Sequence, residues 1–404
     1  MSTNPINRRI ADWLETHWVA PSYSGWLLGS LSIFFFMAAT NTMAGWLYVI
    51  SGIGFALLAI AAILPARSLR HLDVSRRPIS PVSVGEHLTV ELHLHNSSPQ
   101  PKSLLQVRDQ LPSMLAPPQP LAIEAIDPHT GHHWIYCQPA QRRGVYRWHT
   151  VELRTAAPLG LFWCRRNRTV KATAVVYPTV LPLVVCPLLD ELGRDTSLQL
   201  QSDRRAQVAT EGLTRTLRSY RWGDPIRLVH WRTSARYGEL RVRELEIFTG
   251  GQEVVIGLDS ATDWRTAADP TFDSPADFEQ AVVAAASLYF YACRRNLNVR
   301  LWTAGTGLLQ NRQVVLEALA EVQAGEDQNA GEWPDLPFVW LTCRPASLAT
   351  LPANSRWLLW PGDQPLATWQ TQVRAALGKR PSSGLVIRPQ ESLQQQLQAP
   401  GGIV

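Results

Sequence analysis

Residues 211–246 read EGLTRTLRSYRWGDPIRLVHWRTSARYGELRVRELE, and the prediction for the whole chain is organised around them. Polar and aromatic side chains are concentrated in this stretch more densely than elsewhere in the chain. The residues that stand out are Tyr220, Gly223, Asp224, Arg227, His230, Trp231, Ser234, Arg236 and Glu244. The stretch is therefore the first candidate for the centre of function.

A helix is predicted in the middle of this stretch. Asp224 followed by Pro225 is typical of a helix N-terminus, because the carboxylate accepts from free amides and proline at the next position loses no hydrogen bond. Gly238 is a suitable end. The predicted helix spans residues 225–237 and has apolar residues on two faces, so we expect it to be wedged between two surfaces. After Gly238 the apolar alternation slips in phase, which predicts a strand with a bulge.

His230 and Ser234 are close enough on this helix to touch, which suggests nucleophilic catalysis with Asp224 as a third member. A base and the group that orients it must converge on one point, and a capping Asp lies more than a turn away from His230. The alternative role is architectural. In it His230 and Trp231 pack with their ring nitrogens hydrogen-bonded to the backbone, while the arginines pair with Glu239, Glu244 or Glu246. We expect the architectural role.

Upstream, residues 26–64 contain no charged residue. Two apolar runs, 25–39 and 43–64, are separated by Thr40, Asn41 and Thr42. The second run reaches the roughly 20 residues needed to cross a hydrocarbon core, and the first is shorter. We predict a transmembrane hairpin over residues 24–65. The competing interpretations are a signal sequence, for which the run is too long, and a buried hairpin of a soluble protein.

Basic residues flank this hairpin on both sides. Arg8 and Arg9 precede it, and Arg67, Arg70, Arg76 and Arg77 follow it. The positive-inside rule then predicts a multi-pass protein of the plasma (inner) membrane. Its N-terminal segment 1–23, its C-terminus and its soluble domains would all lie in the cytoplasm.

Composition excludes some classes of protein. The net charge of +5 comes almost wholly from arginine, and the arginines are scattered, whereas a nucleic-acid groove would cluster them. We therefore expect no nucleic-acid partner and many internal arginine ion pairs and ring contacts. The five cysteines, Cys137, Cys164, Cys186, Cys293 and Cys343, form no C-x-x-C pair, which fits a reducing compartment and no cysteine metal site.

The middle of the chain, residues 82–182, has the pattern of a β-sandwich of immunoglobulin-like kind. Leu88, Val90, Leu92 and Leu94 alternate with polar residues, and turn clusters follow at 96–101, 127–131 and 156–160. The histidines of this region, His93, His95, His129, His132 and His133, have no recognised ligand spacing, and we expect them to be solvated. Residues 183–206 are predicted to be a connector.

Strands and helices alternate in the C-terminal half. Residues 253–259, 298–303, 338–342 and 356–359 resemble strands, and 276–295 and 313–323 resemble helices, which predicts a doubly wound α/β domain over 207–385. The first of these strands ends in polar residues, and the carboxyl ends of parallel strands are where such sheets bind ligands. Residues 386–404 are predicted to be a flexible tail.

With these residues in view, the chain resembles the family catalogued as domain of unknown function 58. The resemblance depends on Arg218, Tyr220, Gly223, Asp224, Arg227, His230, Trp231, Ser234, Ala235 and Arg236, followed by the acidic strand that ends at Asp259. Arg143, Gly144, Tyr146, Pro158, Gly160, Leu161, Phe162, Val176, Tyr177 and Pro178 are also similar to the family's layout.

The resemblance implies that the α/β domain is like von Willebrand factor type A, an interaction fold that often holds a divalent cation through a D-x-S-x-S motif. Asp259 matches the first position and Asp263 the last, whereas Ala261 replaces the first serine. One ligand is thereby lost, although hard cations need close to six oxygens. We expect no cofactor, with a divalent cation at Asp259 and Asp263 as the alternative. Families of this type also look like partners of MoxR-type AAA+ ATPases.

The sequence therefore predicts a non-enzymatic, membrane-anchored cytoplasmic assembly protein that presents surfaces to a protein partner, such as a MoxR-type ATPase acting on envelope processes. The alternative is a metal-dependent or Ser/His hydrolase that uses residues 224–263.

Overall fold

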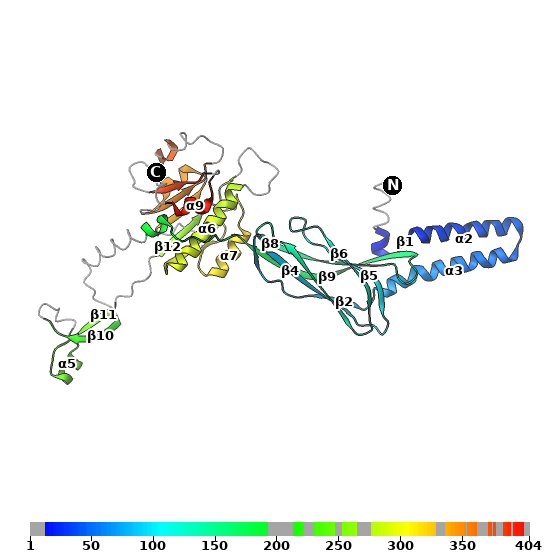
Figure 1. Cartoon of the computed structure of the whole chain (residues 1–404), viewed down its shortest axis with the longest axis horizontal. Coiled ribbons are helices and arrows are strands. Elements are labelled where there is room, and N and C mark those ends of the chain that lie inside the picture. The colour runs from blue at the N-terminus through cyan, green and yellow to red at the C-terminus, as the bar shows by residue number, and fades with distance from the viewer. Residues whose placement is uncertain are drawn as a thin grey trace. The chain divides into compact units, whose positions relative to one another are not determined.

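The computed structural model describes residues 13–192, 213–221, 229–246, 253–264, 276–328, 336–352, 354–361, 371–373, 375–376, 383–388 and 391–399. The chain divides into two compact units, Met1–Tyr177 and Pro178–Val404. Each unit is described by itself (Figure 1).

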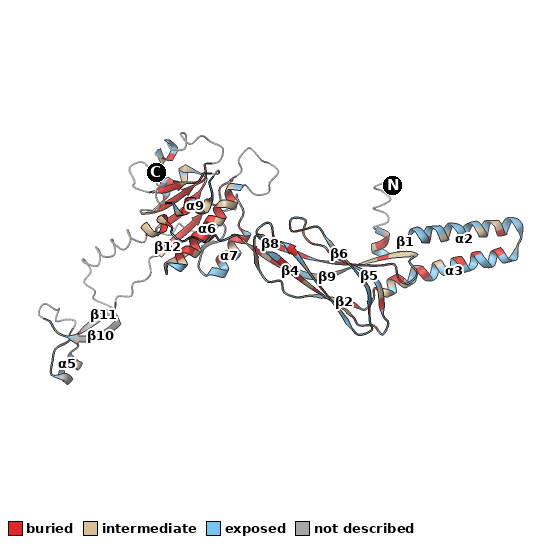
Figure 2. Cartoon of the chain, viewed as in Figure 1, coloured by how far each residue is buried: buried red, intermediate tan, exposed pale blue. Residues whose placement is uncertain are grey.

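Two apolar helices, α2 (Tyr23–Thr42) and α3 (Gly45–Ser68), form an antiparallel hairpin in the first unit. Both are long and apolar enough to cross a membrane. Most of their surface is exposed (Figure 2). On α2 the buried positions recur every seven residues, at Gly25, Ser32 and Ala39. On α3 the same spacing relates Leu47, Gly54 and Ala61, and Ser51 and Pro65 are buried as well. Small residues at this spacing let the two backbones approach closely, as in membrane helix pairs.

The helices are longer than the predicted spans, and the turn between them lies at Met43 and Ala44 instead of at residues 40–42. Thr40 and Thr42 stay helical because their hydroxyls donate to the carbonyls of Met37 and Ala38, both at 2.7 Å. Such hydrogen bonds satisfy the threonine hydroxyls within the helix, so these polar residues can remain in an apolar helix. The hairpin itself is confirmed, and its two helices are consistent with a membrane location.

The rest of the first unit is a β-sandwich. One sheet has the order β2–β4–β7, and the other β1–β9–β8–β5–β6, with β3 paired to β9. The strands are β1 (Ala20–Pro21), β2 (Leu72–Arg76), β3 (Val82–Ser83), β4 (His87–Asn96), β5 (Lys102–Asp109), β6 (Gln119–Ile126), β7 (Gly131–Pro139), β8 (Gly144–Thr155) and β9 (Phe162–Tyr177). The predicted alternation is confirmed, because Leu88, Val90, Leu92 and Leu94 are all buried between the sheets. The structure also contains β2, a strand that the sequence did not predict.

The internal use of arginine is also visible in this unit. Arg76 binds the buried carboxylate of Asp109, and Glu15 is held by Arg154 at 2.7 Å and by Arg165 at 2.9 Å. Arg154 also stacks over the ring of Trp163. These contacts fit the expectation drawn from scattered arginines.

The second unit contains a sheet of order β14–β13–β12–β15–β16–β17, parallel except for the edge strand β14. Its strands are β12 (Glu253–Leu258), β13 (Asn298–Thr303), β14 (Gly307–Leu309), β15 (Phe338–Thr342), β16 (Arg356–Leu359) and β17 (Gly384–Val386). The helices are α6 (Ala276–Arg294), α7 (Arg312–Glu321), α9 (Leu393–Gln398) and the 3-10 helix η2 (Pro345–Thr350). The strands predicted at residues 298–303, 338–342 and 356–359 are confirmed with the same bounds, as β13, β15 and β16.

Both faces of this sheet are covered. Ile256 and Leu258 of β12 pack with Phe278 and Val282 of α6 on one face. On the other face, Trp302 of β13 and Trp340 of β15 pack with Leu348 of η2, and Leu351 joins the same cluster. The sheet is therefore buried on two sides, as its continuous apolar strands require (Figure 2).

Two segments outside the predicted α/β domain boundaries contribute to the packing of this unit. In the predicted connector, residues 183–192 contribute Leu183, Leu189 and Leu192 to the core of the α/β unit. The rest of the connector, from residue 193, lies outside the described part of the chain.

In the predicted flexible tail, α9 buries Leu397 to 1% exposure. The side-chain amide of Gln396 also binds the backbone N–H and C=O of Arg388. The prediction of fraying is wrong for residues 391–399, because polar glutamines here satisfy buried backbone groups.

Candidate functional site

The family-motif residues lie within and next to a small unit formed by β10 (Leu213–Ser219), α5 (Trp231–Tyr237) and β11 (Arg241–Glu246). β10 pairs with β11 antiparallel, and Val229 forms a bridge to Val242. Arg218 lies on β10, and the backbone N–H of Tyr220 donates to the carbonyl of Leu240 at 2.8 Å. Gly223, Asp224 and Arg227 lie outside the described residues.

The helix in this unit begins six residues later than predicted, at Trp231. His230 is the N-cap of this helix, with φ −87° and ψ 84°. Its backbone N–H donates to the carbonyl of Arg241, so this amide is bonded to β11. A helix that began at Pro225 would run through the β-bridge at Val229. The predicted end is confirmed, since Gly238 is the C-cap with φ 72°.

The bulge is also displaced from its predicted position. The register shift falls between Thr214 and Thr216 of β10, whereas β11 pairs without interruption. The extra residue therefore lies on the partner strand, and the bulge predicted after Gly238 is not present in β11.

Ser234 and His230 are in contact, but the serine hydroxyl bonds to the backbone of His230 and not to its ring. The Ser234 hydroxyl donates to the carbonyl of His230 at 3.1 Å and accepts from the backbone N–H of Arg241 at 2.9 Å. Nδ1 of the His230 ring lies 2.7 Å from the Thr233 hydroxyl and accepts from the Thr233 backbone N–H. These bonds cap α5 and attach it to β11, and Ser234 is 7% exposed.

Among the motif residues whose side chains the structure describes, Trp231 is a large one that faces solvent, with 63% of its surface exposed. Leu240, in the turn before β11, is 45% exposed. Tryptophan is enriched among the residues that dominate binding energy in protein interfaces. Arg236 lies on α5. The prediction that α5 is wedged against the α/β sheet stays a prediction.

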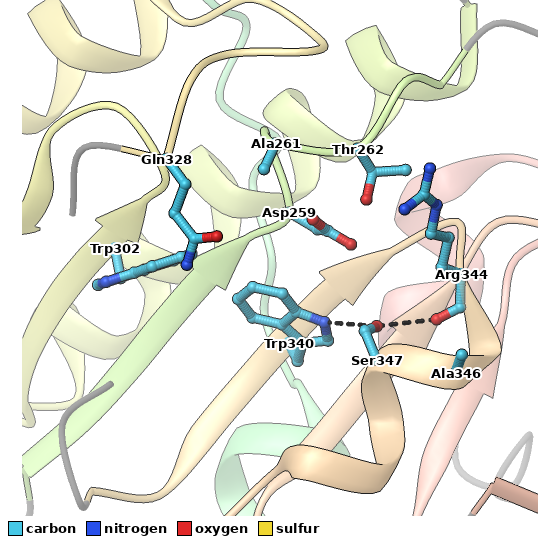
Figure 3. A pocket seen from close by; sticks show the side chains of 9 residues that line it. All are labelled: Asp259, Ala261, Thr262, Trp302, Gln328, Trp340, Arg344, Ala346 and Ser347. Atoms are coloured by element: carbon cyan, nitrogen blue, oxygen red, sulfur yellow. Dashed lines mark hydrogen bonds between the residues drawn. The ribbon is translucent and has the colours of Figure 1, made fainter. Parts of the chain in front are cut away.

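A pocket of about 270 Å³ lies at the carboxyl ends of β12 and β15. It is lined by Asp259, Ala261, Thr262, Trp302, Gln328, Trp340, Arg344, Ala346 and Ser347 (Figure 3). The chain leaves β12 toward α6 on one face of the sheet and leaves β15 toward η2 on the other. Where neighbouring connections diverge in this way, the sheet opens a crevice, and open α/β sheets bind ligands there.

Asp259 is the buried acidic group of this pocket, with 7% exposure. Its Oδ2 accepts from the Thr342 hydroxyl at 2.6 Å, and its carbonyl accepts from Nε1 of Trp264 at 2.7 Å. Burial raises the pKa of the Asp259 carboxyl, while hydrogen bonds from Thr342 and Thr262 and the charge of Arg344 oppose part of that shift. A buried carboxyl with a raised pKa in a crevice is a candidate functional group.

The other polar groups of the pocket come from β15 and η2. The Ser347 hydroxyl accepts from Nε1 of Trp340 at 3.1 Å and donates to the carbonyl of Arg344 at 2.8 Å (Figure 3). Arg344 is exposed at the rim. Burial raises the pKa of the nearby Cys343 thiol to about 12, so this cysteine is not a thiolate at neutral pH.

The side chains of the pocket fit a divalent cation poorly. Ala261 supplies no side-chain oxygen, and the oxygens of Asp259 are engaged by threonines. Asp263, the second acidic residue of the predicted site, is exposed and is not among the residues that line the pocket. The guanidinium of Arg344 adds a positive charge to the same space, whereas a hard cation needs about six oxygen ligands.

Sequence reasoning found Asp259 but missed the groups contributed by other strands. Thr262 lies three residues after Asp259 in the same loop, whereas Arg344 and Ser347 follow β15. Residues 338–342 were predicted to be a strand, so the polar residues at its carboxyl end carried the same signal as those after β12. What was missing was the strand order, which makes β12 and β15 neighbours.

Of the predicted histidines, His93, His95 and His133 lie on the outer face of the β2–β4–β7 sheet. His132 is paired with the buried Leu94, and His129 lies in the turn before β7. The rings of His93 and His133 are 4.2 Å apart, and those of His93 and His95 are 6.4 Å apart. Burial lowers the pKa of His93, and the neighbouring His133 and His95 lower it further. Within the described ranges, no group of three metal-ligating side chains is close enough to hold an ion.

Comparison with known families finds one match. Residues 216–326 match the family described as Protein of unknown function DUF58. This match confirms the predicted resemblance over a segment that runs from within β10 to beyond α7 and contains the motif residues from Arg218 to Arg236 and Asp259. The von Willebrand factor type A-like fold is not addressed by this match and stays a prediction. No curated protein matches the sequence.

Solved structures give weak likenesses. The CARDB domain of a Pyrococcus furiosus protein is 14% identical with a TM-score of 0.18, over 25% of this chain and 94% of that chain. A β-glucosidase from Listeria innocua is 16% identical with a TM-score of 0.16, over 24% and 16%. The alkylpurine DNA glycosylase AlkC of Pseudomonas fluorescens is 14% identical with a TM-score of 0.18, over 42% and 49%. At these scores the likenesses carry no argument about fold or function.

Proposed function

We propose that the protein is a membrane-anchored cytoplasmic interaction module that captures a protein partner at the carboxyl edge of its α/β sheet. In this proposal α2 and α3 hold the chain in the plasma (inner) membrane with both ends in the cytoplasm. The α/β domain is of the von Willebrand factor type A-like kind, and the partner is a MoxR-type AAA+ ATPase in envelope-related processes.

The observation that carries this proposal is the pocket beyond β12 and β15. Its place is the crevice in which open α/β sheets bind ligands. Its lining combines two tryptophans, Trp302 and Trp340, with the guanidinium of Arg344. Tryptophan and arginine are the residues most enriched among those that dominate binding energy in protein interfaces. The volume of about 270 Å³ suits a single side chain of a partner better than a nucleotide-sized substrate.

The motif unit supports the same proposal. Ser234 and His230 are used in capping α5 and joining it to β11, so the polar residues of the motif build a structure. That structure leaves Trp231 exposed on its surface. We propose that Trp231 is a second contact for the partner.

The test is a binding measurement with the full chain in lipid nanodiscs and a purified MoxR-type ATPase. We expect Arg344→Ala and Trp231→Ala each to weaken binding at least several-fold. Arg312→Ala is the matched control: this arginine is also exposed, but it follows β14, which runs antiparallel to β13 and therefore leads to the opposite edge of the sheet. Unchanged binding in both variants, or equal losses in the control, would refute the proposed surface.

A hydrolase that uses residues 224–263 is the second candidate, and the raised pKa of Asp259 favours it. A Ser/His mechanism would need the Ser234 hydroxyl to turn from backbone atoms toward the His230 ring. A panel of ester and phosphoester substrates distinguishes the two candidates. Turnover that is abolished by Asp259→Asn while partner binding persists would favour the hydrolase, and the absence of turnover in the parent chain favours the interaction module.

A further inference from the structure

The loop between β8 and β9, residues 156–161, is tied to the first turn of α2. The hydroxyls of Ser22 and Ser24 donate to the carbonyl of Gly160 at 2.7 and 3.1 Å, and the backbone N–H of Ser22 donates to the carbonyl of Leu161 at 2.9 Å. Gly25 lies directly against that Leu161 carbonyl, and a Cβ at this position would clash with it. The loop is thus fixed beside the first turn of α2.

The apolar surface of α2 begins at this first turn. The helix starts at Tyr23, which is 86% exposed. Trp18 and Trp26, just before and after it, are 72% and 69% exposed. Exposed Trp and Tyr at the end of a spanning helix are typical of the membrane–water interface, where one part of the ring is apolar and another polar. Leu159, on the loop, is a further exposed apolar residue.

The same end of the sandwich carries charged residues of both signs. Arg67 lies in the last turn of α3 and Arg70 follows it, and both are exposed. Exposed acids at this end include Asp73, on β2, and Asp127, in the turn between β6 and β7. This turn is joined to the strand that pairs with β2 through Asn96, whose side chain donates to the Asp127 carbonyl at 3.1 Å. Juxtamembrane arginines attract anionic lipid headgroups.

We propose that this end of the β-sandwich lies against the lipid surface, with Leu159 inserted at the headgroup boundary and Arg67 and Arg70 bound to anionic headgroups. The inference rests on the proposed membrane anchoring of α2 and α3. The occupant of the surface is the bilayer that holds those helices, because the loop and the helix start form one continuous surface joined by hydrogen bonds. The hydrogen bonds therefore join the start of α2 directly to the β-sandwich, without a flexible linker between them.

The test is photocrosslinking of the full chain in nanodiscs that contain zwitterionic and anionic phospholipids. The photoreactive residue p-benzoylphenylalanine replaces Leu159, Met114 or Ile53, one at a time, and lipid adducts are measured by mass spectrometry. Met114 is the matched control, because it is 55% exposed and lies beyond the end of β5 that is remote from the helices. Ile53, 64% exposed on α3, reports on insertion of the hairpin.

We expect strong lipid adducts at positions 53 and 159, with position 159 several-fold above position 114. Adducts at 53 together with equal yields at 159 and 114, or crosslinks from 159 to protein alone, would overturn this inference and leave the anchoring intact. An absence of adducts at 53 would instead overturn the anchoring.

Two further variants test how the surface is positioned. Gly25→Val should push the loop from α2 and lower the yield at 159 without lowering that at 53. Replacing Arg67 and Arg70 with glutamine should reduce the anionic share of the adducts at 159. Unchanged adducts in both variants would contradict the proposed contacts.

Discussion

We expect Asp109→Ala to destabilise the β-sandwich by roughly 3–5 kcal/mol, the usual cost of removing one partner of a buried ion pair. The side chains of Arg76 and Asp109 are 1% and 0% exposed, and Nη2 of Arg76 lies 2.7 Å from both carboxylate oxygens. The same carboxylate accepts from the Tyr136 hydroxyl at 2.6 Å and from Nε1 of Trp148 at 3.1 Å.

The magnitude follows from what the alanine variant leaves behind. The guanidinium of Arg76 would stay buried over the ring of Trp148, with the carbonyl of Val170 as an acceptor at 2.9 Å. The donors of Tyr136 and Trp148 would also lose their acceptor, at about 1–3 kcal/mol for each buried unsatisfied group. These costs are not additive, because all of them depend on one carboxylate and water can enter the space. The double variant Arg76→Met with Asp109→Leu should cost less than the sum of the two single changes.

The assay is urea unfolding of the full chain in detergent micelles. Hydrogen exchange of peptides from β4, β5 and β8 is followed by mass spectrometry, so that the sandwich is measured separately from the α/β unit. Arg77→Ala is the matched control, because its ion pair with Glu91 is exposed and should contribute less than about 1 kcal/mol. A loss below about 1 kcal/mol for Asp109→Ala, or single-variant costs that add in the double variant, would refute the reasoning.

Three further predictions concern other parts of the chain. Ser234→Ala should speed hydrogen exchange in β11 and cost about 1 kcal/mol, because a strand amide loses its acceptor, and unchanged exchange would contradict the capping role. Gly257→Ala should lower the stability of the α/β unit by about 1–3 kcal/mol in thermal unfolding, because a Cβ would lie 2.5 Å from the ring of Trp340, and an unchanged midpoint would count against this packing. The lowered pKa of His93 means that its contribution to stability is present above its unfolded pKa of about 6.5 and is lost as the pH falls through the folded value. His133→Asn should raise the pKa of His93 in an NMR titration, and an unshifted titration would refute the coupling.

Much of the secondary structure was predictable because it depends on local periodicity. The strands at 338–342 and 356–359 are nearly continuous runs of apolar residues between polar breaks, and buried parallel strands have that pattern. The charge-free stretch predicted the helical hairpin for a similar reason. Gly238 ended its helix as predicted, because the left-handed conformation favours glycine.

The failures occurred where a distant segment competes for the same backbone groups. Asp224 and Pro225 have the local features of a helix start, yet His230 gives its backbone N–H to Arg241 of β11, so the helix begins at Trp231. The glutamine-rich tail looked unstructured, but Gln396 binds the backbone of Arg388 and Leu397 enters the core.

The amino-acid sequence by itself determined the apolar hairpin, the alternating strands of the sandwich and the α/β succession, since each depends on the order of neighbouring residues. It also located the candidate carboxylate Asp259 at a strand end. Only the tertiary structure decided what surrounds that carboxylate, because Thr342, Arg344 and Ser347 reach it through the pairing of β12 with β15. In the same way, the Gly160 carbonyl meets Ser22 across 138 residues of sequence, a contact that chain folding alone creates.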